Sequence, residues 1–409
     1  MARFAWWKEA SPDARRALVA ASFGWMLDSF DVMLWAMVVA KLMPDLGLSK
    51  PAAGMLGSLT LAASAVGGLI FGVAADRFGR RKALMASILI YSVFTAACGF
   101  ATGVAMLAVF RIFLGLGMGG EWASGAALVS ETWPAEHRGK ALGIVQSSWA
   151  VGYAAAAAVA ALVLPVWGWR GVFFVGVIPV FFTLWIQRKV KEPELWTRAR
   201  AASAGVRTGF GEIFGRKRLR LTIFVTVMNA CTMFGWWGFN LWLPAYLSMA
   251  PEQGGIGLRP WAMSALVIFM QAGMWLGYIT FGFISDRLGR KRSYVGFLVA
   301  AAAFMLLYSR TREPLLLFAL GPFVAFFGTG YFTGFGALTA EIYPTSVRAT
   351  AQGITYNAGR IVSAAAPFAV GSLAETRGFS FSFVVIAAAF LAAAALWAGI
   401  PETKGQPLE

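Results

Sequence analysis

The sequence predicts an all-α membrane protein with twelve transmembrane helices in two pseudo-symmetric six-helix bundles. Three observations lead to this fold class: the composition, the spacing of apolar runs, and an internal repeat. Of the 409 residues, 59% are hydrophobic and 13% are charged, whereas a soluble domain carries roughly 25% charged residues. The apolar residues extend over the whole length of the chain, so the composition indicates a membrane protein.

Twelve apolar runs are long enough to cross a bilayer as helices, for which about 18 residues or more are needed. The first run is too long for a signal peptide and is followed by more of the same, so we interpret it as a span. The runs are 17–43, 52–75, 83–102, 104–130, 140–164, 167–187, 221–249, 261–284, 293–309, 314–340, 350–373 and 379–399.

The formal charge of +16 is unevenly distributed between the loops. With an even number of spans, both termini lie on one side, and the termini and loops of that side together hold 26 of the 35 Lys and Arg residues. Basic loops stay cytoplasmic during insertion, so we predict cytoplasmic termini and a bacterial-type inner membrane. The basicity therefore indicates topology and contact with anionic lipid, and we expect no nucleic-acid partner.

Cysteine and histidine offer no cofactor chemistry. Cys98 and Cys231 lie in apolar spans without disulfide or metal-ligand spacing, and the single histidine, His137, lies in a loop. No phosphate loop, metal box or nucleophile motif occurs. We expect no metal, no cofactor and no enzyme activity.

The two halves of the chain repeat each other. GVAADRFGRRK, from Gly72, recurs as GFISDRLGRKR, from Gly282, and ETWPAEHRGKALG, from Glu131, recurs as EIYPTSVRATAQG, from Glu341. Both offsets are 210 residues, and Pro193-Glu194 has a counterpart in Pro401-Glu402 at nearly the same offset. Parallel repeats of this kind place a substrate between two bundles. The predicted domains are 1–187, a cytoplasmic linker 188–220, and 221–409.

These paired loops resemble the signature of the major facilitator superfamily, and the resemblance covers the whole chain. Residues 111–131, the DSFD of residues 28–31, and residues 357–367 are similar to the proton-coupled organic-acid branches, the sialate, aromatic-acid and metabolite:proton symporters. The resemblance implies a secondary active transporter that takes up a small organic monocarboxylate with protons by alternating access. We expect a monomer whose coupling ion is H⁺.

The repeated loops carry the predicted gating residues. An Asp at a helix end near several guanidiniums can form charge-assisted pairs, and the resemblance implies that such clusters latch the two halves together. The alternative is a charge cluster that only enforces orientation. The set is Asp76, Arg77, Arg80, Arg81, Glu131, Arg138, Asp286, Arg287, Arg290, Glu341 and Arg348.

Five ionisable residues stand out as candidates inside the membrane: Asp28, Asp31, Arg111, Glu121 and Arg360. A charge at the bilayer centre costs at least about 2.5–3.5 kcal/mol, so such residues usually serve function or pair with one another. Asp28 and Asp31 share one helix face and cannot both ionise cheaply in a dehydrated cavity, which predicts a proton site. The alternative is that one of them is a permanent partner of an arginine.

The two arginines need anions because a guanidinium keeps its proton. We predict that Arg360 is a bidentate clamp for the substrate carboxylate. Arg111 matches the family's fourth-span arginine, which the resemblance ties to proton coupling; its alternative is a structural pair with Glu121 or an Asp. Glu121 follows a glycine ladder and is either a second proton site or a gate residue.

A small-molecule site is mostly apolar with a few placed polar groups. The candidates to line it are Asn357, Asn229, Asn240, Gln146, Gln271, Trp237 and Tyr331. Trp237 and Tyr331 are also compatible with helix packing or an interfacial belt.

Three other functions remain as alternatives. A sugar or other metabolite carrier of the same fold is the nearest, although the seventh span lacks the paired glutamines of the sugar porters. A drug exporter is less favoured because the fifth span lacks the Gly-Pro pair typical of that group. A transport-fold sensor is the third.

Overall fold

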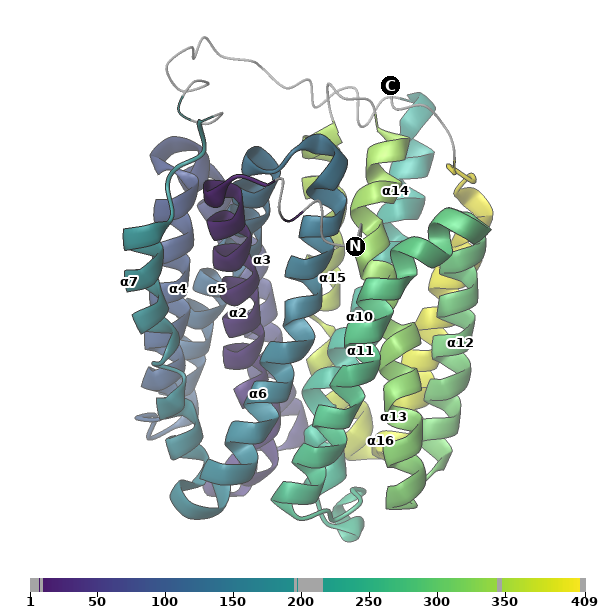
Figure 1. The fold of residues 1–409 in the computed structure, drawn as a ribbon. Helices are drawn as coiled ribbons and strands as arrows, with labels where there is room; N and C mark the ends of the chain where they lie inside the picture. Colours follow the sequence, from purple (N-terminus) through teal and green to yellow (C-terminus); the bar gives the residue numbers. More distant parts are fainter. Residues whose placement is uncertain (1–6, 8–9, 195–196, 198–215, 344–347, 405–409) are drawn as a thin grey trace. The chain divides into compact units, whose positions relative to one another are not determined.

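The computed structural model describes residues 7, 10–194, 197, 216–343 and 348–404 (Figure 1). Within these ranges every regular element is a helix, which confirms the all-α prediction. The chain forms two compact units. Unit 1 comprises Met1–Val38 and Ala62–Gly205, and unit 2 comprises Val39–Leu61 and Val206–Glu409.

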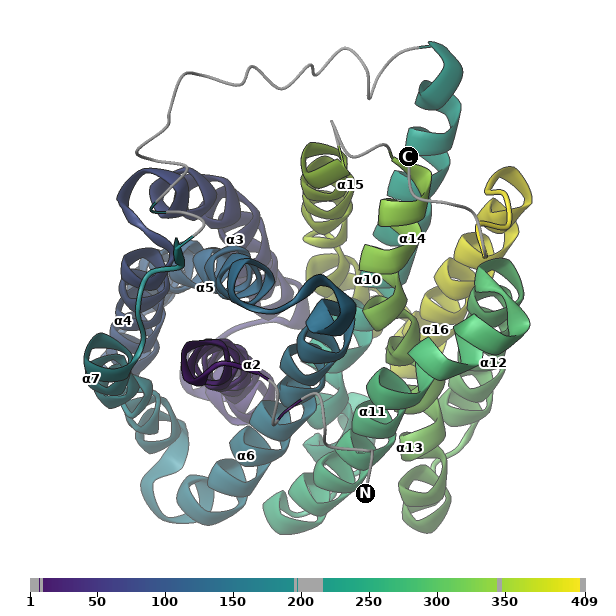
Figure 2. The same ribbon diagram turned by 45° about the horizontal axis from the view of Figure 1, so that its top comes forward.

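Unit 1 is built around its first helix. Figure 2 shows α2 among α4, α5, α6 and α7, and contacts confirm it: Tyr91 of α4 donates to the Gly24 carbonyl, and Ser29 donates to the Trp149 carbonyl of α6. The helices are α2 (Pro12–Asp45), α3 (Lys50–Phe78), α4 (Arg80–Cys98), α5 (Val104–Thr132), α6 (Ala135–Val175) and α7 (Pro179–Lys189).

Unit 2 contains the remaining helices together with the adjoining ends of α2 and α3. In it, the Phe368 N–H donates to the Ser58 hydroxyl at 3.2 Å, and Lys50 pairs with Glu375 at 3.6 Å. Its elements are α10 (Arg216–Ser248), η2 (Pro251–Gln253), α11 (Pro260–Leu288), α12 (Arg290–Arg310), α13 (Pro314–Thr329), η3 (Gly330–Gly334), α14 (Phe335–Ile342), α15 (Arg348–Ser363), α16 (Ala366–Leu396) and η4 (Trp397–Gly399). The division into consecutive bundles, 1–187 and 221–409, stays a prediction of the repeat.

Nine helical stretches in the described part are long and apolar enough to cross a membrane. Two of them, His137–Lys189 and Ala351–Gly399, contain 53 and 49 residues, or about 70–80 Å at 1.5 Å per residue, which is more than twice the hydrocarbon thickness of about 30 Å. Each is broken at a glycine with positive φ, Gly168 (63°) or Gly378 (80°), and therefore crosses twice. With the 34-residue α2, the described helices provide twelve spans.

Two predicted spans of unit 2 are not continuous helices. The run 314–340 is interrupted by the 3₁₀ segment η3, and the run 350–373 is interrupted by a turn at Ala364–Ala365. Pro367 explains the second break because it has no N–H to offer the Ser363 carbonyl one turn earlier. Because both runs are apolar throughout, their hydropathy does not indicate either break.

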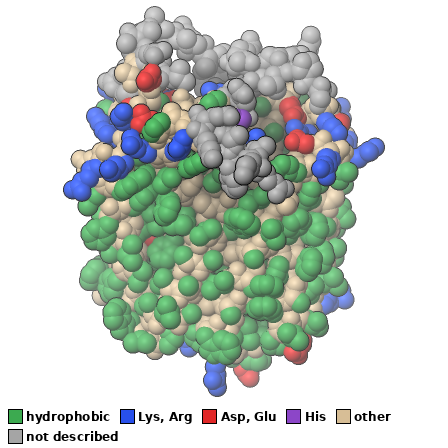
Figure 3. Space-filling view, viewed as in Figure 1, with side chains coloured by type: hydrophobic (Ala, Val, Ile, Leu, Met, Phe, Trp, Pro, Cys, Tyr) green, Lys and Arg blue, Asp and Glu red, His purple; other side chains and the backbone are tan. Residues whose placement is uncertain are grey.

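The outer surface of the helices is apolar. Val73, Leu162 and Phe283 are each more than 65% exposed, and Figure 3 shows hydrophobic side chains over the sides of both units with Lys and Arg gathered at the helix ends. Such exposure is stable when lipid replaces water as the solvent, so the protein is an integral membrane protein.

We expect Gly168→Ala to lower the free energy of unfolding by about 1–3 kcal/mol, because its φ of 63° and ψ of −170° belong to a region that is almost confined to glycine. Thermal unfolding in detergent measures the effect. The matched control is Gly72→Ala, where an added Cβ meets nothing within 4 Å; equal midpoints for the two variants would contradict the role of the Gly168 turn.

Candidate functional site

The repeated loops build the same three-residue charge cluster in each unit. In unit 1, Arg80 at the start of α4 pairs with Asp76 of α3 and with Glu131 of α5, the latter at 2.7 Å. In unit 2, Arg290 pairs with Asp286 at 2.6 Å and Glu341 at 2.8 Å. Each arginine, only 13–14% exposed, thus ties three helix ends together. We call these the Arg80 cluster and the Arg290 cluster.

The remaining predicted gating residues lie around the two clusters. Arg138 donates to the Trp133 carbonyl at 3.0 Å, whereas Glu131 accepts from Arg80 through its Oε1 atom. Arg81 donates to the Gln187 and Val190 carbonyls near the end of α7. Arg77 and Arg287 are exposed, and the side chain of Arg348 lies outside the described residues.

A glutamate late in each unit caps the helix that begins with the arginine of the cluster, α4 in unit 1 and α12 in unit 2. Glu192 accepts hydrogen bonds from the Arg81 and Lys82 N–H groups, and Glu402 accepts from those of Arg290 and Lys291 at 2.7 and 3.1 Å. The first N–H groups of a helix lack intrahelical partners and favour an anion. The structural counterpart of Glu402 is therefore Glu192, at an offset of 210, and the proposed match between Pro193-Glu194 and Pro401-Glu402 was wrong.

Glycine permits this cap. Gly79 and Gly289 have φ of 113° and 98°, and a Cβ on either would lie within 2.6 Å of the capping carboxylate. The Gly of the D-R-x-G-R loops thus provides both a left-handed turn and room for the glutamate.

The charge of Glu402 is stabilised by these bonds. Partial burial opposes its ionisation, but the N–H groups of Lys404, Arg290, Lys291 and Thr403 outweigh burial and hold the pKa of Glu402 below its usual value. The Thr403 hydroxyl also donates to Glu341 at 2.5 Å, which connects the cap to the Arg290 cluster.

The interior of unit 1 contains three carboxyl groups. Asp28, Asp31 and Glu121 are each 1% exposed. Asp28 interacts electrostatically with both of the others, and Tyr91 of α4 interacts with all three. The structure therefore brings the predicted proton-coupling acids together at the junction of α2, α4 and α5.

The neighbours of these acids are backbone and hydroxyl groups. The Glu121 carboxylate lies against Gly24, where a Cβ would come within 2.4 Å of its oxygen. The Thr95 hydroxyl of α4 donates to the Tyr91 carbonyl, and the carboxylate oxygens of Asp31 and Glu121 have no hydrogen-bond partner among the described residues. Neither Asp31 nor Glu121 forms a salt bridge within the described residues.

Arg111 is fully buried, and its guanidinium lies over the indole of Trp35 at 4.4 Å. None of its three nitrogens has a hydrogen-bond acceptor among the described residues. The expected alternative of a structural pair with Glu121 or an Asp is thus not the arrangement seen here; a cation–π contact takes its place.

Arg360 lies in unit 2, one turn before the break between α15 and α16. It is 3% exposed, and no described residue forms an ion pair with it. Asn229 of α10 donates to the Thr355 carbonyl at 3.4 Å and fits against Gly359, where a Cβ would lie 2.5 Å from its amide nitrogen. Asn229 therefore supports the helix that carries Arg360.

The other predicted lining residues are largely buried. Asn240 donates to the Trp236 carbonyl and Gln271 to the Val267 carbonyl, both within their own helices. The Gln271 carbonyl oxygen and the Tyr331 hydroxyl have no hydrogen-bond partner in the described ranges. Trp237 is 7% exposed, while Gln146 and Asn357 are half-buried.

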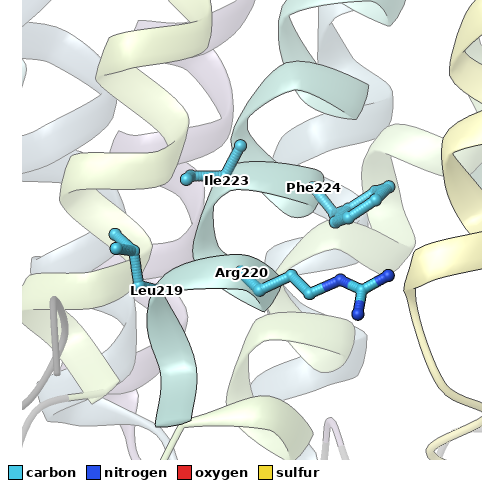
Figure 4. A pocket seen from close by; sticks show the side chains of 4 residues that line it. All are labelled: Leu219, Arg220, Ile223 and Phe224. Carbon is cyan, nitrogen blue, oxygen red and sulfur yellow. The ribbon is translucent and has the colours of Figure 1, made fainter. Parts of the chain in front are cut away.

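A pocket of about 390 Å³ lies elsewhere, at the start of α10. Figure 4 shows its four lining side chains, with Leu219 and Ile223 on one side of the helix and Arg220 and Phe224 on the other. None of the predicted substrate residues lines it, so it is not the predicted site.

Sequence reasoning missed Trp35, Glu192 and Thr403. Trp35 is four residues after Asp31 and thus on the same helix face, a spacing that could have indicated it. Glu192 could have been found from the strict 210-residue offset to Glu402. The contact of Thr403 with Glu341 has no sequence signal.

Comparisons with known proteins agree with this architecture. The family model of the Major Facilitator Superfamily matches residues 18–280 and 247–408. A putative metabolite transport protein of Haemophilus influenzae is 34% identical over 96% of this chain and 98% of its own length. The probable 4-methylmuconolactone transporter of Cupriavidus pinatubonensis is 34% identical over 99% of this chain and 95% of its own.

A third relative, the cis,cis-muconate transport protein of Acinetobacter baylyi, is 34% identical over 91% of each chain. Among solved structures, a D-xylose-proton symporter superposes with a TM-score of 0.77 over 97% of this chain and all of that one. At 19% identity, this likeness shows the fold alone.

We expect Glu402→Gln to destabilise the protein by about 0.3–1 kcal/mol at pH 7, the usual contribution of an anion at a helix N-terminus. Because the folded pKa of Glu402 lies below its usual value, this contribution is present above about pH 4.3 and disappears as the pH falls through the folded pKa. Thermal unfolding of both proteins across this range measures it. Glu375→Gln, within α16 and away from its N-terminus, is the control. A stability difference between Glu402→Gln and the unmodified protein that stays constant at every pH would refute the cap.

Proposed function

The chain belongs to the Major Facilitator Superfamily and is a membrane transporter, not an enzyme, and we propose that it takes up a small organic monocarboxylate together with protons by alternating access. The observation that carries the proposal is Arg360, a buried guanidinium with no ion-pair partner among the described residues. A guanidinium stays protonated, and a buried charge without a counter-ion is costly. A substrate carboxylate meets that need.

The number of buried cations favours one carboxylate per substrate molecule. Arg360 is the one buried Lys or Arg of unit 2 within the described ranges, and its planar fork binds one carboxylate through two parallel hydrogen bonds. A second carboxylate on the same molecule would find no second buried cation in that unit.

The acids of unit 1 support proton coupling. Asp28, Asp31 and Glu121 are buried with one guanidinium, Arg111, among the described interior residues. Three ionised carboxylates would leave an uncompensated negative charge, which burial makes costly. Binding of protons to these acids is therefore favoured. Release of these protons to the cytoplasm would then accompany release of the substrate.

The two charge clusters serve as gates in this proposal. They lie at helix ends whose loops are the basic ones, which the positive-inside rule assigns to the cytoplasm, as it does both termini. We propose that they latch the halves of a monomer in the inner membrane when the cytoplasmic side is closed, and that rocking of the halves releases the latch.

The relatives favour an organic acid or a related metabolite. Besides the two named for 4-methylmuconolactone and cis,cis-muconate, others are named for sialic acid, niacin and gentisate. Uptake into proteoliposomes of labelled nicotinate, gentisate, sialic acid, cis,cis-muconate and D-xylose, with and without a proton gradient, tests the class. Gradient-driven accumulation of D-xylose alone would establish the sugar alternative instead.

We expect Arg360→Ala to weaken binding of the transported acid about ten- to a hundredfold, since a hydrogen bond to a charged group contributes roughly 1.5–3 kcal/mol. Arg360→Lys should be intermediate because an ammonium cannot reproduce the bidentate fork. Competition of unlabelled acid against labelled uptake measures the affinity. Arg310→Ala, at an exposed position, is the control, and unchanged affinity in the Arg360 variants would exclude the clamp.

We expect Asp31→Asn to retain exchange of the acid but to lose accumulation driven by a pH gradient, because an amide cannot carry the proton. Counterflow and gradient-driven uptake in the same vesicles separate the two activities. Glu252→Gln, at an exposed residue, should behave like the unmodified protein. Normal accumulation in both Asp31→Asn and Asp28→Asn would remove this pair from proton coupling.

A further inference from the structure

We propose that the pocket at the start of α10 binds an anionic phospholipid, with the lipid phosphate on Arg220 and one acyl chain along Leu219 and Ile223. The pocket has a volume of about 390 Å³, and its walls are formed by Leu219, Arg220, Ile223 and Phe224 (Figure 4). It lies within unit 2, and none of the residues in the proposed transport mechanism lines it. The site therefore concerns a ligand other than the transported solute.

Two of the lining side chains, Leu219 and Ile223, lie on the outer face of α10, where they are 38% and 51% exposed. On the inner face, Thr222 and Val225 are at most 3% exposed. There the Tyr343 hydroxyl donates to the Thr222 hydroxyl at 3.0 Å. These buried contacts fix the rotation of the helix about its axis, so the outer face stays directed away from the interior of the unit.

An apolar stripe leads from the pocket along the helix. Leu219, Ile223 and Val227 follow one another at four-residue spacing and therefore lie on one side, and Val227 is 42% exposed. From residue 219 to residue 227 the stripe is about 12 Å long at 1.5 Å per residue, which is most of the roughly 15 Å that one leaflet contributes to the hydrocarbon core. An acyl chain that descends from the headgroup region can lie along it.

Arg220 supplies the positive charge of the pocket. Its guanidinium lies 5.7 Å from the centre of the Phe224 ring, and no described carboxylate forms a salt bridge with it. The Phe224 ring is itself held against Gly399, where a Cβ would come within 2.5 Å of the ring. Because a guanidinium can bind a phosphate through two parallel hydrogen bonds, Arg220 is suited to a phospholipid headgroup.

The position of the pocket favours a lipid over a soluble anion. The helix opens with the sequence RKRLR, which begins at Arg216 and contains four cations. The loops at this end of the helices are the basic ones, which the positive-inside rule assigns to the cytoplasm, and anionic lipid attracts clusters of Lys and Arg beside a membrane helix. A soluble phosphate would leave the apolar part of the pocket without a partner, whereas a phospholipid contacts both parts.

The test is site-specific photocrosslinking of the full chain in bilayers that contain equal amounts of phosphatidylethanolamine and phosphatidylglycerol. Ile223→p-benzoylphenylalanine places the reactive group at the pocket, and mass spectrometry identifies the lipid that it captures. Leu184→p-benzoylphenylalanine is the matched control. Leu184 of α7 is 50% exposed and lies one turn before the exposed Arg188, so it shares the apolar side chain and the nearby cation but not this pocket.

We expect the lipid captured at position 223 to contain phosphatidylglycerol in about fivefold excess, the effect of one basic residue close to an anionic lipid. The excess should disappear in Arg220→Gln and remain in Arg188→Gln. Arg220→Lys should keep part of it, because an ammonium retains the charge but not the planar fork. The lipid captured at position 184 should have the composition of the bilayer.

Equal capture of the two lipids at position 223, an excess that survives Arg220→Gln, or the same excess at position 184 would overturn the proposal. Capture of a second copy of the chain in place of lipid would assign the pocket to self-association. Loss of the excess on addition of inorganic phosphate, but not of sodium chloride at equal ionic strength, would assign it to a soluble anion. The measurement needs no transported substrate, so its outcome is independent of the proposed function.

Discussion

A guanidinium surrounded by apolar helices cannot lose its charge and needs an anion or another attractive partner. The choice of that partner shapes much of the interior. In unit 1, Arg111 lies over the face of Trp35, and its three nitrogens have no hydrogen-bond acceptor among the described residues. In unit 2, Arg360 has no ion-pair partner among the described residues. The two arginines therefore differ in their surroundings: Arg111 lies against an aromatic face, whereas Arg360 is the residue that we propose to bind the substrate carboxylate.

The internal repeat preserves the charged helix ends of the two halves but not their charged interior residues. Every member of the Arg80 cluster has its counterpart 210 residues later in the Arg290 cluster, and the glycine breaks at 168 and 378 obey the same offset. The interior charges do not. At the same offset, Asp28, Asp31, Arg111 and Glu121 correspond to Gly238, Leu241, Gly321 and Tyr331, respectively. The residue that corresponds to Arg360 in the first half is Ala150. Duplication thus preserved the scaffold and the helix ends, while the ionisable interior belongs to each unit alone.

The helix breaks of unit 2 have a related consequence. Irregular backbone within a membrane protein is tolerated where it lines a cavity or is covered by protein. The break between α15 and α16 follows Arg360 by one turn, and Asn229 supports the same helix at Thr355 and Gly359. The backbone that follows Arg360 is therefore less constrained than the backbone of a continuous helix would be.

The amino-acid sequence was sufficient to predict the fold class, the twelve spans, the repeat and the five charged residues in the interior, because hydropathy and charge in lipid are properties of composition and length. The partners of the charged residues became visible in the folded structure. Arg80 rather than Arg138 occupies Glu131, Glu192 rather than Glu194 matches Glu402, and Trp35 rather than an acid holds Arg111. The physical reason is that a pairing depends on distances between helices far apart in the chain, and local sequence periodicity carries no information about those distances.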